Sequence, residues 1–323
     1  MIIIYQQKMK LKYKYFWVIL FVFLLISVLF LGYSHTISEN FENIKVDIGN
    51  FICVYFYNMS LAFIDGKDYS EEIPEQDFIK YLPKKVPLDE KIKQTLLENQ
   101  FTKEELEKEG KSIGIAGTWV IRNNRREIYW KIMKPFIHEK LENAFIQSGL
   151  KNDAVNETKN TICIHFRCSD VPFVRYEGYY LQKYSYFKEC LDQVSHLNYK
   201  TIKLVSCQFH NSSEENRTAC DKYLSSLVEY LSSLGYTVEM QCKSNVEDFA
   251  SLFYAPVVIS TGGSFSFMSG FFGNGVFISE GHGLEDDETK CTDCEWLKHG
   301  YSLKHDAVKD YYDTDNVISI LKS

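Results

Sequence analysis

The sequence lacks an excess of positive charge, and this argues against a general nucleic-acid-binding protein. Its 323 residues carry a formal net charge of −7. Without the four lysines of the first 14 residues, the remainder carries −11. General nucleic-acid binding depends on a basic surface, so no nucleic-acid partner is expected. A phosphate-bearing ligand would need a local basic site instead.

The first 14 residues lack acidic side chains, and a long apolar run follows them over residues 15–33. Roughly 18 to 20 helical residues cross a hydrocarbon core of about 30 Å. Lysines before the run and acidic residues after it predict a cytosolic N-terminus. A cleaved signal peptide is the alternative, but no small-residue cleavage pattern is clear and the run is long for such a peptide. We therefore expect a cytosolic tail over residues 1–14, a transmembrane signal-anchor helix over 15–33 and a stem over 34–50.

Two features of the remaining chain indicate an oxidising, luminal compartment. Nine cysteines are present, an odd number that leaves at least one unpaired. Four Asn-x-Ser/Thr triplets are potential glycosylation acceptors. Their asparagines are Asn58, Asn156, Asn211 and Asn216. The sequence thus predicts a single-pass type II membrane protein of the Golgi or the endoplasmic reticulum.

No internal repeat or low-complexity tract is evident, and the half that begins near residue 156 alternates between two patterns. Strand-like segments cover residues 161–166, 201–206, 236–241, 256–260 and 275–279. Helical patterns cover residues 184–194, 220–234 and 245–254, the last capped by Asn245, and a short final helix over 317–321. This alternation predicts an α/β fold with a parallel, Rossmann-like sheet. Residues 51–155 are expected to form a largely helical N-terminal lobe. In it, residues 51–56 fit either a strand or a buried segment, a helical run over 89–108 can break at 101–102, and a helix over 124–147 contains Pro135.

Polar side chains cluster where the strand over 161–166 ends. His165, Arg167 and Asp170 lie within six residues of one another. In an open α/β sheet, ligands bind at the carboxyl ends of the strands. The guanidinium of Arg167 suits a phosphate, which it can hold by two parallel hydrogen bonds. A structural Arg–Asp ion pair at a strand end is the alternative interpretation.

A second candidate segment follows the strand over 256–260. Two glycines, Gly262 and Gly263, allow close approach of the backbone to a ligand. Ser264 then lies near the start of a helix-like run, where backbone N–H groups favour an anion. Because carboxyl ends of parallel strands meet at one edge, this loop and Arg167 are expected to converge. A plain tight turn is the alternative.

Both segments resemble the fucosyltransferase superfamily, which has a two-lobed GT-B fold. His165-Phe-Arg167-Cys-Ser-Asp170 is similar to its motif I, usually His-x-Arg-Arg-x-Asp. Residues 248–270, DFASLFYAPVVISTGGSFSFMSG, resemble its later phosphate-loop segment, most of all that of α1,2-fucosyltransferases. The resemblance covers residues 161–270. Cys168 replaces the second Arg of the motif and Ser169 the usual Gly.

The resemblance implies a metal-independent transfer of fucose from GDP-fucose to a hydroxyl of a glycan or glycoprotein. It implies that Arg167 binds the β-phosphate, and that Ser264 and Phe265 contact the diphosphate. The expected donor-binding residues are Arg167, Thr261, Gly262, Gly263, Ser264, Phe265 and Ser266. The expected catalytic residues are Arg167, Asp170 and His165. Asp170 is a candidate general base or a residue that orients Arg167, Glu177 is a further candidate base, and His165 fits a buried strand residue as well as a base. The nucleotide-sugar lobe is expected over residues 156–323, with a GDP-sugar as co-substrate and no cofactor.

Other interpretations stay open. Asp313-Thr-Asp315 fits the Asp-x-Asp of a metal-dependent transferase, or a simple cap of the last helix. Cys291 and Cys294 fit a disulfide, a zinc half-site or a redox pair. A transferase that uses a different sugar nucleotide is possible. So is a membrane-tethered protein that binds glycans or nucleotide sugars without catalysis.

Overall fold

The computed structural model of the chain describes residues 47–76, 78–111, 126–168, 170–175, 180–207, 213–280, 294–297 and 301–323. The expected tail, the transmembrane helix and most of the stem lie outside these ranges. Within them, no helix combines the length and the apolar character needed to cross a bilayer. Residues Ile48–Ser323 form a single compact unit.

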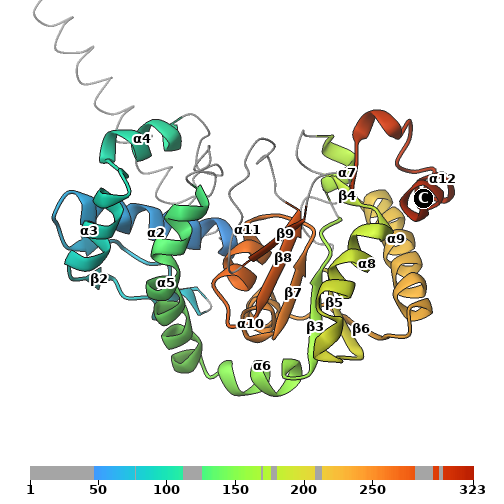
Figure 1. Cartoon of the computed structure of the whole chain (residues 1–323), viewed down its shortest axis with the longest axis horizontal. Coiled ribbons are helices and arrows are strands. Elements are labelled where there is room, and N and C mark those ends of the chain that lie inside the picture. The colour runs from blue at the N-terminus through green and yellow to red at the C-terminus, as the bar shows by residue number, and fades with distance from the viewer. Residues whose placement is uncertain are drawn as a thin grey trace, which may run out of the picture. The chain divides into compact units, whose positions relative to one another are not determined.

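A parallel sheet lies at the centre of this unit (Figure 1). Its main strands are β3 (Thr161–His165), β5 (Thr201–Val205), β6 (Thr237–Gln241), β7 (Val257–Ser260) and β8 (Val276–Glu280). They follow the order β6-β5-β3-β7-β8, and β9 (Cys294–Leu297) extends the sheet beside β8. Every neighbouring pair is parallel. The predicted α/β, Rossmann-like sheet is therefore confirmed, strand by strand.

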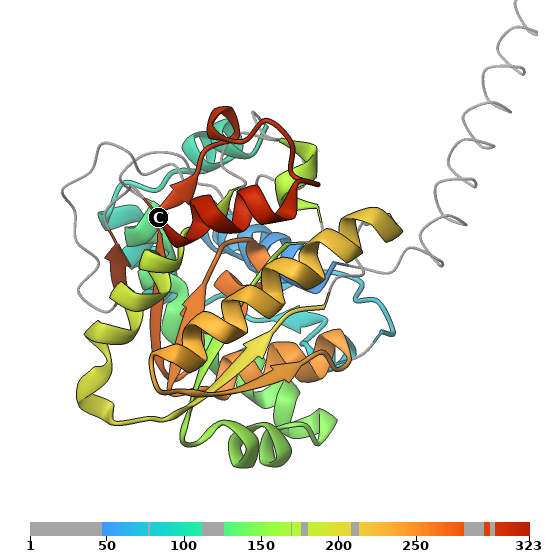
Figure 2. The same ribbon diagram turned by 90° about the vertical axis from the view of Figure 1, so that its right-hand side faces the viewer.

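One face of the sheet is covered by α8 (Tyr184–Gln193), α9 (Glu214–Ser233) and α12 (Thr314–Lys322), which lie to the right in Figure 1 and toward the viewer in Figure 2. Ile162 and Ile164 of β3 are fully buried there, in one apolar cluster with Phe187 of α8 and Leu227 of α9. Alternate residues of a strand point to one face, so β-branched side chains at alternate positions supply this core.

The opposite face is covered by α6 (Lys151–Thr158), α10 (Asn245–Tyr254) and the short α11 (Ser264–Ser266) with the wider turn η4 (Phe267–Phe271). A Cβ on Gly270 would come within 2.8 Å of both Val258 and Phe277, so η4 packs directly on β7 and β8. Two longer helices, α2 (Ile48–Ile64) and α5 (Arg126–Ser148), pack behind this layer. Trp130 of α5 contacts Phe267 with ring centroids 6.0 Å apart.

The N-terminal part is formed by helices and one small antiparallel sheet. The sheet pairs β1 (Tyr69–Ser70) with β2 (Lys85–Val86), and the chain forms η1 (Ile79–Tyr81) in the segment that connects these two strands. Then follow α3 (Glu90–Glu98) and α4 (Lys103–Lys111), so the helical run breaks near Phe101 as predicted. Residues 51–56, which periodicity left undecided, belong to α2 and are mostly buried. The stem was expected to reach residue 50, but α2 already begins at Ile48.

Several elements differ from the sequence-based expectation. The helix expected over 220–234 begins earlier, at Glu214, because the Ser213 side chain accepts a hydrogen bond from the Asn216 backbone. The cap of α10 is Ser244, with Glu247 completing a capping box, and not Asn245. Elements not predicted are α6, β1, β2, η1, β9, α7 (Val171–Val174), η3 (Ser195–Leu197), η5 (His305–Ala307), and β4 (Leu181–Gln182) with its partner β10 (Ser302–Leu303). These are short or lack clear apolar periodicity.

Candidate functional site

The two candidate segments leave the sheet side by side. β3 and β7 are neighbours, with His165 opposite Ser260 at their carboxyl ends. The Arg167 backbone N–H donates to Oγ1 of Thr261 at 2.9 Å. The Thr261 hydroxyl in turn donates to the His165 carbonyl at 3.1 Å. The expected convergence of the Arg167 segment and the glycine loop is therefore present, and Thr261 links the two segments.

The turn after β7 requires glycine. Gly262 has φ +113° and Gly263 has φ +92°, a region that residues with a Cβ rarely adopt. A Cβ on Gly263 would lie 2.9 Å from Nη1 of Arg167 and 3.5 Å from its Cδ. The guanidinium therefore lies directly against the backbone of the glycine turn, a closer approach than the expected convergence at one sheet edge required.

The structural ion pair that the sequence left open is also formed. Nε of Arg167 donates to Oδ1 of Asp170 at 3.2 Å, and Nη2 donates to Oδ2 at 2.7 Å. Only 9% of Asp170 is exposed, so the pair is largely shielded from solvent. Two parallel hydrogen bonds fix the plane of a guanidinium. Nη1, which takes no part in this pair, is the nitrogen that adjoins Gly263.

His165 is a neutral side chain in this setting. Burial, and after it the charge of Arg167, lowers the pKa of His165 from 6.5 to about 3. Its ring lies 5.5 Å from that of Phe265. Its buried Nδ1 has no hydrogen-bond partner among the described residues. An imidazole with this pKa does not hold a proton near neutral pH, which makes His165 a weak general base.

The serines of the glycine loop make contacts within the protein. Oγ of Ser264 donates to Oδ1 of Asn50 at 2.7 Å. Ser266 is fully buried, 2.7 Å from the Ser260 hydroxyl, and it donates to the Gly262 carbonyl. Ser266 therefore stabilises the turn through buried hydrogen bonds, whereas Ser264 lies where the loop contacts α2.

The first turn of α2 is a part of this site that the sequence did not indicate. A Cβ on Gly49 would lie 2.6 Å from the Phe265 backbone nitrogen, so α2 approaches the loop backbone as closely as a glycine allows. Asn50 and Ser264 are 214 positions apart in the chain. Neither Gly49 nor Asn50 belongs to a recognisable motif, so no sequence signal pointed to them.

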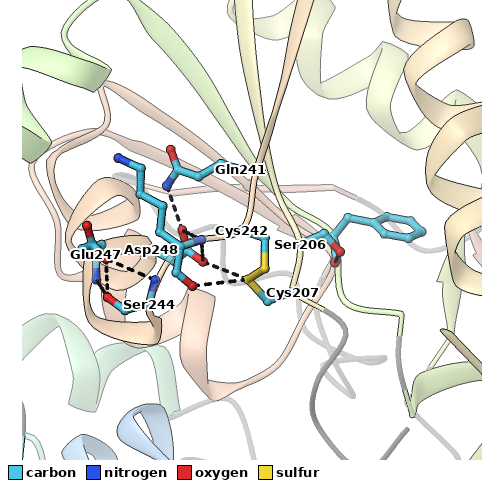
Figure 3. Close-up of a disulfide and its surroundings, with 9 residues drawn as sticks. Ser206, Cys207, Gln241, Cys242, Ser244, Glu247 and Asp248 are labelled. Atoms are coloured by element: carbon cyan, nitrogen blue, oxygen red, sulfur yellow. Dashed lines mark hydrogen bonds between the residues drawn. A yellow bond between two sulfur atoms is a disulfide. The ribbon is translucent and has the colours of Figure 1, made fainter. Parts of the chain in front are cut away.

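Two disulfides lie beside the carboxyl edge of the sheet. Cys168, the residue after Arg167, is bonded to Cys220 of α9. Cys207 and Cys242 join the segments that follow β5 and β6 (Figure 3). Three further buried cysteines, Cys53, Cys163 and Cys190, take part in neither bridge. Both bridges agree with the expected oxidising compartment.

A buried carboxyl group lies next to the second bridge (Figure 3). Asp248 is 2% exposed and accepts hydrogen bonds from Nε2 of Gln241 at 2.8 Å and from the Lys243 backbone. Burial raises the pKa of Asp248. One of its oxygens lies 3.2 Å from Sγ of Cys207. These contacts fix the start of α10 against β6, and they account for Asp248 without a role in ligand binding.

The remaining candidates fall into two groups. Asp313 caps α12 by accepting a hydrogen bond from the Asn316 backbone, as the simpler interpretation of Asp313-Thr-Asp315 expects. Glu177 and Cys291 lie outside the described residues, as does the side chain of Cys294. Among the residues that the structure describes, no cluster of three or more His, Cys, Asp or Glu side chains is placed to hold a metal ion.

Comparisons with known proteins add no relative. No protein-family model matches this chain, and neither a curated protein nor a solved structure matches it.

Proposed function

We propose that this chain is a glycosyltransferase that moves a sugar from a nucleotide diphosphate to a hydroxyl of a glycan or glycoprotein. One observation carries the proposal, namely the contact between the Arg167 guanidinium and the Gly262–Gly263 turn at the carboxyl edge of the sheet. A fixed cation and a Cβ-free backbone, side by side at such an edge, suit a diphosphate. The resemblance of both segments to fucosyltransferases makes fucose from GDP-fucose the leading donor.

In the proposed reaction, the diphosphate gains negative charge as the glycosidic bond breaks. Arg167 stabilises that charge, and a preorganised donor of this kind is typically worth about 3 kcal/mol, or on the order of 10² in rate. Asp170 holds the guanidinium in plane through both of its oxygens. This geometry supports a positioning role for Asp170 more than that of general base. With the guanidinium as the stabilising cation, the proposed transfer needs no divalent metal.

The proposal places the described unit in the lumen as a GT-B-like enzyme. The parallel sheet corresponds to the donor-binding lobe of that fold, over residues 156–323, and the helices before it to the N-terminal lobe. Residues 15–33 anchor the chain as a type II membrane protein of the Golgi or the endoplasmic reticulum. The two disulfides support this compartment.

The test is a thermal-shift panel of GDP-, UDP- and CMP-sugars on the purified full-length chain. A ligand that binds only the native state raises the melting temperature by mass action. We expect GDP-fucose to give a clear shift in the wild type and little or none in Arg167→Lys. If no sugar nucleotide shifts the wild type, the proposal fails. Transfer activity that EDTA abolishes and Mn²⁺ restores would point to a metal-dependent transferase instead.

A second candidate is a non-catalytic protein that binds glycans or nucleotide sugars. The specific observation in its favour is that Arg167 is already paired with Asp170, while the usual second Arg is the disulfide-bonded Cys168. Binding of GDP-fucose without hydrolysis or transfer to any acceptor in a glycan array would support this candidate. Measurable transfer would exclude it.

A further inference from the structure

The C-terminal segment touches the start of α9 at a glycosylation triplet. Asn216, the third residue of α9, begins the triplet Asn216-Arg-Thr218. The Tyr312 hydroxyl donates to Oδ1 of Asn216 at 2.8 Å. N-linked sugars attach to the other amide atom, Nδ2, so this hydrogen bond and a glycan are compatible. Thr218, the third residue of the triplet, is exposed.

The ring of Tyr312 is held rigidly and exposed at the same time. It stacks on Phe173 with centroids 5.0 Å apart and planes 19° apart. Its backbone N–H donates to Asp310, and its hydroxyl to Asn216. Tyr312 nevertheless remains 43% exposed. Phe173 covers one face of the ring, and the hydroxyl end of the ring adjoins Asn216.

The other described triplets lack this arrangement. Asn58 is half-buried in α2, as Asn216 is in α9, but its triplet partner Ser60 is fully buried and hydrogen-bonded with Tyr129. Asn156 is exposed on α6, whose sequence KNDAVNET contains no aromatic residue. The third residue of that triplet, Thr158, is fully buried, and α6 offers no ring of its own for a sugar at Asn156 to pack against.

We propose that Asn216 carries an N-linked glycan whose first sugar packs on the exposed part of the Tyr312 ring. A bond forms between Nδ2 of Asn216 and C1 of an oligosaccharide carried on a lipid diphosphate. The bond from C1 to the phosphate oxygen breaks, the lipid diphosphate leaves with the electron pair, and the amide loses one proton. The apolar face of a pyranose ring covers aromatic surface that is otherwise open to water. This inference rests on the luminal placement proposed above, but not on transferase activity.

The packed glycan would fasten the C-terminal segment to α9. Tyr312 connects Phe173, which lies one turn after Asp170, to the first turn of α9. A sugar across Tyr312 and Asn216 adds a further contact between segments that are 96 positions apart in the chain. The glycan is therefore expected to stabilise the folded state, and not only to decorate it.

The first measurement is site occupancy on the full-length chain produced in cells with a secretory pathway. Peptide N-glycosidase treatment in heavy-oxygen water converts each formerly glycosylated Asn to labelled Asp, which peptide mass spectrometry locates. We expect label at Asn216 and none at Asn58. An unlabelled Asn216 peptide beside a labelled Asn156 peptide would overturn the proposal. Absence of label at every triplet would overturn it together with the luminal placement, whatever the nucleotide-binding panel shows.

The second measurement tests the packing through a thermal cycle. Enzymatic deglycosylation should lower the melting temperature of the wild type by on the order of 2 °C, and that of Tyr312→Ala by much less. Asn156→Gln is the matched control, because it removes a triplet far from Tyr312 and leaves the wild-type effect in place. An equal fall in the wild type and in Tyr312→Ala would refute the packing. Because the comparison is made within each variant, the stability lost by the Tyr312 substitution itself cancels.

Discussion

Replacing Gly263 with alanine tests the proposed diphosphate site most directly. Gly263 has φ +92° and ψ 155°, a combination that is almost restricted to glycine. Forcing another residue into such a region costs about 1–3 kcal/mol. The added Cβ would also lie 2.9 Å from Nη1 of Arg167. Since that nitrogen ends a flexible side chain, the guanidinium would move away from the turn and strain its pair with Asp170.

Gly235→Ala supplies a matched control. Gly235 has φ +91°, and a Cβ there would meet nothing within 4 Å. Both substitutions should therefore lower the free energy of unfolding by about 1–3 kcal/mol, which denaturant titration measures. Only Gly263→Ala should also weaken the binding of GDP-fucose. A hydrogen bond to a charged group contributes about 1.5–3 kcal/mol, so the expected loss of affinity is about 10- to 150-fold.

The assay is titration calorimetry of GDP-fucose at a temperature well below the melting points of both variants. If Gly263→Ala binds as tightly as Gly235→Ala, the guanidinium and the glycine turn do not act on the same ligand. The assignment of the site would then be wrong, even though the two groups are in contact in the folded protein.

Three further outcomes are expected. Arg167→Lys keeps the charge but loses the two parallel hydrogen bonds to Asp170, so turnover should fall on the order of 10²-fold. Circular dichroism should show that the fold is retained. Turnover near the wild-type value would contradict the phosphate role. His165 stays neutral in the folded protein and takes up a proton in the unfolded chain, so its contribution to stability is complete above pH 6.5 and declines toward pH 3. Lowering the pH from 6.5 to 5 should therefore reduce the free energy of unfolding by up to about 2 kcal/mol, as measured by denaturant titration. If His165→Gln shows the same dependence of this free energy on pH, the reasoning is wrong. Serine at both Cys168 and Cys220 opens a bridge that spans 52 positions, and the unfolding free energy should fall by about 4 kcal/mol; equal denaturant midpoints for the variant and the oxidised wild type would exclude this.

The sheet was predictable because its strands are apolar runs that end abruptly in polar or glycine-rich turns. Ile162 and Ile164 of β3 alternate toward one core, and this pattern survives in the sequence without any knowledge of partners. The helix α6 was not predictable in the same way. Its residues KNDAVNET bury only Ala154 and Thr158, so no apolar stripe marks it. Short elements held by neighbours leave little periodic signal.

The contacts of the candidate site also differ in how far the sequence predicts them. The approach of Arg167 to Gly263 follows from topology, because parallel neighbours present their carboxyl ends together. The contact between Asn50 and Ser264 does not, since a hydrogen bond across 214 positions follows no local pattern. The pairing of Cys168 with Cys220 was likewise beyond the sequence, because connectivity among nine cysteines has many solutions.

The Cys168–Cys220 bridge bears directly on the proposed diphosphate site, because Cys168 stands where the motif that this segment resembles has a second Arg. Cys168 directly follows Arg167, and its disulfide ties this part of the backbone to α9. Asp170 holds the guanidinium by two hydrogen bonds. A group that is already fixed loses little conformational freedom when it binds a ligand, and it needs no reorganisation as charge develops. One rigid cation against a glycine turn can then take over part of what two more mobile cations would supply. On this reasoning, opening the Cys168–Cys220 bridge should weaken diphosphate binding through Arg167 as well as the fold, since both depend on the same fixed backbone.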